Sequence, residues 1–162
     1  MHMKHLITLG ATALVAAALT ACKESHNHDH DHAGHGHHHT PPHGGTAVAL
    51  GKEEFHLELV LDATNATIQA YVMDGHLENY IRVTNATFNV VASTDGPPKT
   101  LTFQAVASTA SGEKVGDTSL FEAKADWLKT TPKFDGVLEE LTVRGKKFEK
   151  VPFNFPKGNH AH

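Results

Sequence analysis

The chain has 162 residues, including 15 His, and its 14 Lys and Arg against 18 Asp and Glu give a formal net charge of -4 with His neutral. A chain of this length is expected to form one domain. The acidic balance and the lack of a basic run argue against nucleic acid as a partner. A single Cys excludes an intramolecular disulfide.

The N-terminus, residues 1–21, has the layout of a secretory signal peptide. Lys4 precedes an apolar run from Leu6 to Leu19, which is too short for a comfortable transmembrane helix. The run ends in Leu19-Thr20-Ala21-Cys22, which resembles the lipobox of bacterial lipoproteins, where the Cys is lipidated and becomes the first mature residue. We therefore expect a protein of the bacterial cell envelope, anchored to a membrane by a lipid on Cys22 and facing the periplasm or the exterior. The alternative is an ordinary signal peptide with a chance Cys.

Residues 22–43 are predicted to be a flexible tether, because they show no hydrophobic periodicity. Nine of the eighteen residues from His26 to His43 are His. Short His-rich tracts are typical of metal binding, since neutral imidazole is the commonest metal ligand in proteins, and zinc also accepts carboxylate oxygen. The candidate ligands of the tether are His26, His28, Asp29, His30, Asp31, His32, His35, His37, His38, His39 and His43.

The ligand chemistry of the tether favours borderline divalent ions. Imidazole suits zinc, Cu(II), nickel and cobalt, and we expect zinc or Cu(II) first. Cu(I) prefers soft sulfur, but Met73 is the one thioether after residue 21, and the thiol of Cys22 is predicted to be lipidated. A solubilising spacer and an expression tag are the alternative interpretations of the tether.

From Thr46 onward, short alternating segments bounded by turns predict β-strands. The strand spacing favours an all-β domain over residues 44–157, an antiparallel β-sandwich of the immunoglobulin-like kind, with an open barrel as the alternative. Residues 158–162 are expected to be a C-terminal tail. The expected strands are Thr46–Leu50, Glu54–Asp62, Ala66–Asp74, Tyr80–Val83, Thr87–Ser93, Leu101–Ala107, Leu120–Ala125, Val137–Val143 and Phe148–Phe155.

A second set of candidate ligands lies on the predicted strands. His56 and Glu58 are two residues apart, so both leave the sheet on one side. If Leu61 pairs with Thr67, then Leu57 meets Tyr71 and Glu54 meets Asp74, which places Asp74 on the outer face with His56 and Glu58. A slip of one residue would move Asp74 to the other face. The alternative for Glu58 is a solvated sheet residue, and for Asp74, followed by Gly75, a turn residue.

Three segments carry a resemblance to a known family: His43-Gly44-Gly45, His56-Leu57-Glu58-Leu59-Val60, and Tyr71-Val72-Met73-Asp74. Together with the His-rich leader they resemble small His-rich bacterial envelope proteins and the His-rich N-terminal domains of adaptor subunits in heavy-metal efflux systems. The resemblance covers about residues 26–74. It implies a periplasmic metal-binding role with His43, His56, Glu58 and Asp74 as site residues. A complete adaptor is not expected, because the sequence lacks a long coiled-coil hairpin.

The sequence as a whole predicts a lipid-anchored extracytoplasmic protein that binds divalent transition metal ions, to buffer them or deliver them to an efflux complex. The alternative is a structural or protein-interaction lipoprotein whose His tract is a pH-sensitive spacer. An enzyme is not expected, because the sequence has no Ser/His/Asp motif, no Gly-rich phosphate loop and no His-Glu-x-x-His segment.

Overall fold

The computed structural model describes residues 40–159, which form an antiparallel all-β domain. This confirms the predicted fold class. A four-residue 3-10 helix (Asp126–Lys129) follows β6, and no helix in the described part is long and apolar enough to cross a membrane. The predicted signal peptide, Cys22 and residues 23–39 of the tether lie outside the described residues. The strands are β1 (Thr46–Leu50), β2 (Phe55–Asp62), β3 (Thr67–Asp74), β4 (Thr87–Ser93), β5 (Lys99–Ala105), β6 (Leu120–Lys124), β7 (Phe134–Val143) and β8 (Lys146–Phe155).

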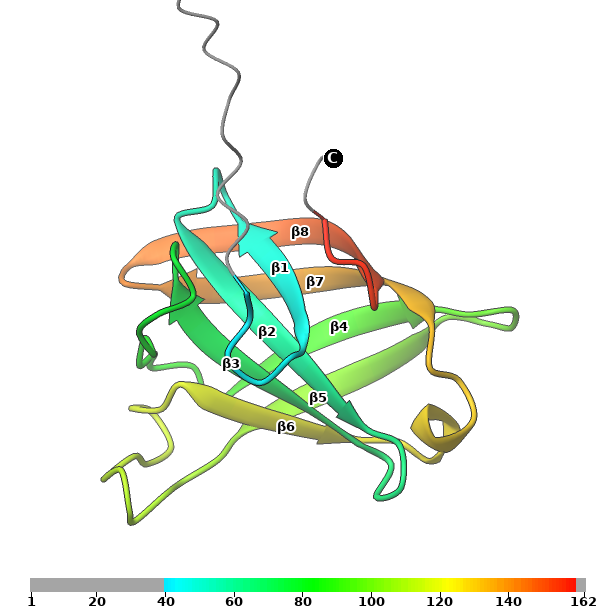
Figure 1. The fold of residues 1–162 in the computed structure, drawn as a ribbon, viewed down its shortest axis with the longest axis horizontal. Coiled ribbons are helices and arrows are strands. Elements are labelled where there is room, and N and C mark those ends of the chain that lie inside the picture. Colours follow the sequence, from blue (N-terminus) through cyan, green and yellow to red (C-terminus); the bar gives the residue numbers. More distant parts are fainter. Residues whose placement is uncertain (1–39, 160–162) are drawn as a thin grey trace, which may run out of the picture. The chain divides into compact units, whose positions relative to one another are not determined.

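The eight strands belong to one sheet in the order β1-β2-β3-β6-β5-β4-β7-β8. The sheet curls until β1 and β8 come near each other, so it is nearly closed into a barrel (Figure 1). Asn159 helps to join these ends: its side-chain amide accepts the N–H of Ala49 at 2.7 Å and donates to the C=O of Ala49 at 3.1 Å. One side chain thereby satisfies both backbone groups of an edge residue, as a neighbouring strand would.

Alternate residues of β1 to β6 fill the interior of the barrel. Phe88 and Phe103 stack across β4 and β5 with ring centroids 4.7 Å apart, and Leu57 and Leu59 of β2 are each 1% exposed. Full burial of one such side chain stabilises the fold by about 1.5–3 kcal/mol. On β2 the period-2 alternation that predicted the strand therefore also identified its inner face.

The expected strand Tyr80–Val83 is not formed. Tyr80 makes an isolated bridge with Met73, and Val83 makes another with Thr118. The N–H of Ile81 donates to the backbone C=O of Val72 at 2.8 Å, whereas the N–H of Val83 donates to the backbone C=O of Thr118 at 2.9 Å. The segment passes from one neighbour to another within a few residues, so no continuous ladder develops.

The register of β2 and β3 differs by one residue from the predicted one. Phe55 pairs with Asp74 and Glu58 pairs with Tyr71, so Asp74 lies on the opposite face of the sheet from His56 and Glu58. This pairing turns three β3 side chains into the core, each 0% exposed: Ile68, Ala70 and Val72. The other face of β3 carries Tyr71 and Met73. Because both faces are apolar, hydrophobic matching alone could not select the register.

Candidate functional site

The His-Gly-Gly segment forms a hook, Pro41 to Gly45, that loops over β2 before β1 begins (Figure 1). The N–H of Gly44 donates to the C=O of Pro41 at 3.0 Å, and Gly44 has a φ of +67°, where residues with a side chain are rare. A Cβ on Gly45 would lie 2.6 Å from the backbone oxygen of Leu59 and 2.9 Å from Cγ of Glu58. The first glycine provides the turn, and the second allows the close approach to β2.

The hook covers Glu58, whose side chain is 0% exposed. Oε1 accepts the backbone N–H of His43 at 2.8 Å and that of Gly45 at 2.9 Å. Oε2 lies 2.7 Å from Nδ1 of the His43 ring. A buried carboxylate is costly unless donors surround it, and here the hook supplies three. Glu58 is thus not the solvated sheet residue that the sequence left open.

The His43 ring has a fixed orientation. It stacks on the ring of Tyr71, with centroids 3.9 Å apart and planes 12° from parallel, and Nε2 lies 3.2 Å from the hydroxyl of Tyr80. With the carboxylate of Glu58 as acceptor, Nδ1 carries the hydrogen, so Nε2 of the neutral ring accepts from Tyr80. The His43 side chain is 30% exposed. Nε2 is therefore the nitrogen that can serve as a ligand.

The surroundings of Tyr71 change the pKa of its hydroxyl. Burial raises the pKa of the Tyr71 hydroxyl, and the nearby Tyr80 and Glu58 raise it further. The neutral phenol donates to the side-chain oxygen of Gln69 at 2.9 Å. Tyr71 therefore contributes a neutral aromatic surface beneath His43.

His56 and Asp74 contact each other where β2 begins and β3 ends. His56 is 2% exposed, and its Nδ1 lies 3.3 Å from the backbone oxygen of Asp74. The Asp74 carboxylate closes the following turn, with Oδ1 accepting the N–H groups of His76 and Glu78 and Oδ2 accepting from Asn79. Burial opposes ionisation of Asp74, but these hydrogen bonds outweigh it and hold the pKa of the Asp74 carboxyl below its usual value. Asp74 thus has the turn role that the sequence left open.

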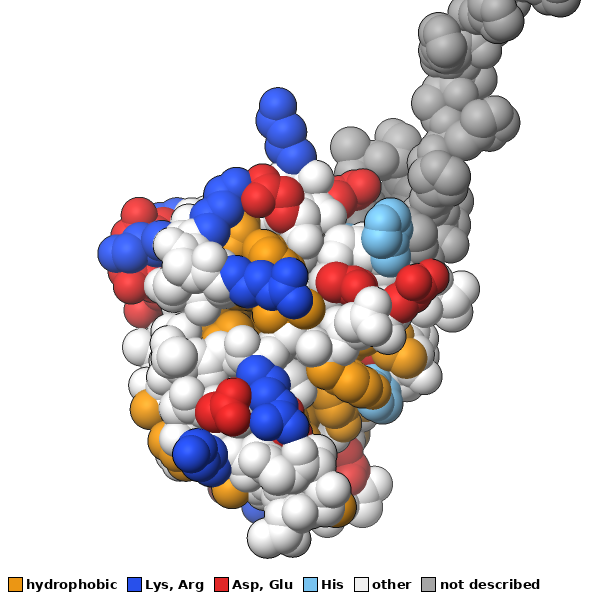
Figure 2. Space-filling view, turned by 90° about the vertical axis from the view of Figure 1, so that its left-hand side faces the viewer, with side chains coloured by type: hydrophobic (Ala, Val, Ile, Leu, Met, Phe, Trp, Pro, Cys, Tyr) orange, Lys and Arg blue, Asp and Glu red, His pale blue; other side chains and the backbone are white. Residues whose placement is uncertain are grey.

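The four predicted ligands of the folded domain therefore do not converge. The structure brings together His43 and Glu58, while the carboxylate of Asp74 points to a different face. Within residues 40–159, no group of three or more His, Cys, Asp or Glu side chains is arranged to hold a metal ion. Histidine side chains do reach the surface of this part, beside acidic and hydrophobic ones, on the face shown in Figure 2.

Sequence reasoning gave no role to Tyr71 and Tyr80, although both contact His43. Tyr71 belongs to the Tyr-x-x-Asp pattern, so that pattern could have identified it as a residue of the site. Tyr80 is 51% exposed, and 37 residues separate it from His43. No local pattern could have linked the two.

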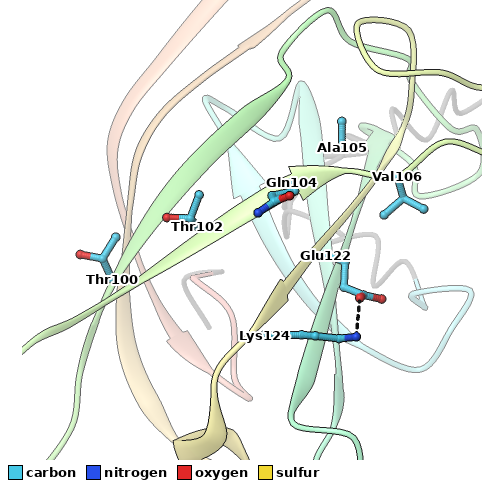
Figure 3. Close-up of a pocket in the computed structure, with 7 residues that line it drawn as sticks. All are labelled: Thr100, Thr102, Gln104, Ala105, Val106, Glu122 and Lys124. Carbon is cyan, nitrogen blue, oxygen red and sulfur yellow. Dashed lines mark ion pairs between the residues drawn. The ribbon is translucent and has the colours of Figure 1, made fainter.

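A separate depression lies on the outer surface where β5 and β6 diverge (Figure 3). Its ionisable groups are Glu122 and Lys124, which form an ion pair at 3.6 Å. The other lining side chains are hydroxyl, amide or small apolar groups: Thr100, Thr102, Gln104, Ala105 and Val106. This lining offers no set of metal ligands and no nucleophile beside a base. The His43 cluster is therefore the stronger candidate site.

The chain was also compared with known proteins. No protein-family model, no curated protein and no solved structure matches it.

Proposed function

We propose that this protein is a lipid-anchored extracytoplasmic protein of the bacterial cell envelope that binds divalent transition metal ions. The observation that carries the proposal is the run from His26 to His43, in which nine of eighteen residues are His. Zinc and Cu(II) fit this ligand set best, and nickel and cobalt are accepted by the same chemistry. The geometry of His43, oriented by Glu58 at the C-terminal end of this run, supports the proposal.

Binding proceeds by ligand exchange among many similar sites. A tract with so many imidazoles offers overlapping ligand sets, so an ion can pass from one set to the next. Metal ions compete with protons for the imidazole nitrogens, and the affinity therefore rises with pH through the range in which His loses its proton. Such a tract suits buffering of metal ions and their delivery to an efflux complex.

The test is a calorimetric titration with Zn(II) at pH 7.5, using the chain from Lys23 onward, which contains every described strand. We expect sub-micromolar affinity and more than one bound ion. The matched control replaces residues 26–39 with a Gly/Ser segment of equal length, which should abolish most of the bound ions. Millimolar affinity in the unaltered chain would reject metal binding as the function and favour the structural or interaction lipoprotein.

A further inference from the structure

The ladder between β5 and β6 is short and ends where the two strands diverge (Figure 3). It contains two residue pairs, and the last of them joins Gln104 to Glu122. Toward the start of β5, Thr100 and Thr102 pair with β4 on one side. Within residues 40–159 no strand pairs with their other side. The sheet therefore has an opening between β5 and β6.

The backbone groups of Thr100 and Thr102 point into this opening. Just after β5, the N–H of Val106 donates to the C=O of Leu120 in β6 at 2.9 Å, whereas the N–H of Ala105 donates to the segment just before β4 at 2.9 Å. Because neighbouring residues of an antiparallel strand direct their backbone groups to opposite sides, steps of two residues back from Val106 lead to Thr102 and Thr100 on the β6 side. These two residues form the free edge of β5.

The two outer edges of the sheet, at β1 and β8, are capped. Asn159 satisfies both backbone groups of Ala49 on β1. On β8, Asn154 exchanges two backbone hydrogen bonds with Gly158, at 2.9 Å and 2.7 Å, and Pro152 has no N–H to donate. Caps of this kind keep an edge from pairing with another chain. The free edge of β5 has no comparable cap in the described part.

We propose that the free edge of β5 binds an extended peptide segment of a partner protein, which adds as a strand in the opening between β5 and β6. In this mode of recognition main-chain hydrogen bonds supply the affinity, and alternate side chains supply the specificity. The segment must be a single strand, because β6 closes the opening at Gln104. A strand that already belongs to a sheet, as in a second copy of the barrel, would bring its neighbours against β6.

The surroundings of the free edge define the chemistry of the segment. Toward the interior, an added strand lies beside Leu101 and Phe103, each 1% exposed, which favours apolar residues. Toward solvent it lies beside Lys124, whose side chain is 71% exposed although it pairs with Glu122 at 3.6 Å. Lys99, at the start of β5, forms no ion pair among the described residues. These two cations favour acidic residues at the outward positions, so the segment alternates apolar and acidic residues.

The first test uses a synthetic heptapeptide of alternating Val and Glu and the chain from Lys23 onward, with backbone amides observed by ¹H–¹⁵N NMR. In the free protein the N–H groups of Thr100 and Thr102 should exchange rapidly with solvent, and the bound peptide should slow their exchange at least about tenfold. Protected amides in the free protein, or no slowing at about 1 mM peptide, would overturn the proposal. This measurement needs no substitution, so it does not depend on the folding of a variant.

Two N-methylated forms of the peptide distinguish strand addition from side-chain binding. Methyl groups on one set of alternate amides remove the hydrogen bonds to β5, and methyl groups on the other set leave them. One form should therefore bind at least about tenfold more weakly than the other. Equal affinities of the two forms would overturn strand addition.

Substitution at Thr102 provides the matched pair of variants. Thr102→Pro removes the N–H that faces the opening and should weaken the unmethylated peptide at least about tenfold, whereas Thr102→Val keeps the backbone and should change its affinity less than about twofold. Equal effects of the two changes would contradict the role of the free edge.

The last arm tests the charge of the segment and the identity of the occupant. A peptide of alternating Val and Lys should bind at least about threefold more weakly than the Val and Glu peptide, with a difference that shrinks at high salt. Equal affinities would overturn the acidic preference. Sedimentation of the free protein should show a monomer. A dimer that the peptide dissociates would assign the edge to a second copy and overturn the proposal.

Discussion

Oε2 of Glu58 lies 2.7 Å from Nδ1 of His43, across fifteen positions of sequence. The same carboxylate accepts two backbone N–H groups through Oε1. One buried acid therefore holds both the backbone and the side chain of the hook. The arrangement is asymmetric: loss of the carboxylate leaves three donors without a partner, while loss of the imidazole removes one donor and keeps two.

Glu58→Ala should lower the free energy of unfolding by about 1–3 kcal/mol, because buried donors lose a charged acceptor. Urea unfolding at pH 7 measures this change. Glu122→Ala is the matched control, since Glu122 lies on the outer face of β6 in a partly exposed ion pair with Lys124, where a change of at most about 0.5 kcal/mol is expected. Equal losses in the two variants would mean that the hook contributes nothing to stability.

Gly45→Ala should displace the hook, because a Cβ there would lie 2.6 Å from the backbone oxygen of Leu59. We expect a loss of about 1–3 kcal/mol in the free energy of unfolding and loss of the protected Nδ1 hydrogen of His43 in NMR spectra. Gly96→Ala is the control, since a Cβ on Gly96 meets nothing within 4 Å. A retained Nδ1 signal in Gly45→Ala would contradict the close approach.

The prediction of the strands succeeded because burial on one face leaves a period-2 trace in the sequence. β1 and β4 begin and end at the predicted residues, Thr46–Leu50 and Thr87–Ser93. The predicted register of β2 and β3 was wrong because the outer face of β3 is also apolar. A tight turn after Asp62 sets the observed pairing instead. There Oδ1 and Oδ2 of Asp62 accept from Asn65, at 3.1 Å and 2.7 Å.

Two members of the candidate site were predictable, but its two tyrosines and its geometry were not. The sequence singled out His43 and Glu58, yet it placed Glu58 on an open face with Asp74. Burial of that face depends on the backbone of Gly44 and Gly45, which lets the hook fold back over β2. A pattern of alternating polar residues carries no information about a segment that packs on top of it.

Asp74→Asn should change how stability depends on pH. Hydrogen bonds lower the pKa of Asp74 in the folded state, so its carboxylate stabilises the fold above the unfolded pKa of about 3.9, and this stabilisation is lost as the pH falls through the folded pKa. The stability difference between the original chain and Asp74→Asn should therefore be largest near pH 6 and shrink below about pH 4. Urea midpoints at pH 6, 4 and 3 measure it, and a difference that grows on acidification would contradict the assignment.

Cys22→Ser should leave the protein without a lipid. The apolar run ending in Leu19-Thr20-Ala21-Cys22 motivates this expectation. Each buried CH₂ of an acyl chain contributes about 0.8 kcal/mol to membrane anchoring, so several chains hold a protein firmly. Metabolic labelling with a radioactive fatty acid should mark the original protein and not the variant. An unlabelled original protein would end the lipoprotein interpretation.

Tyr80→Phe tests what happens at Nε2 of His43 when an ion binds. The Tyr80 hydroxyl lies 3.2 Å from Nε2, so an ion on that nitrogen must displace it. One hydrogen bond contributes about 0.5–1.5 kcal/mol net, so its removal should strengthen Zn(II) binding at Nε2 of His43 by about two- to tenfold, as measured by calorimetry. Tyr71→Phe is the control: it keeps the ring beneath His43 and removes a hydroxyl that bonds Gln69, so the affinity should stay the same. Weaker binding in Tyr80→Phe would show that the Tyr80 oxygen is itself a ligand and that the hydroxyl does not compete with the ion.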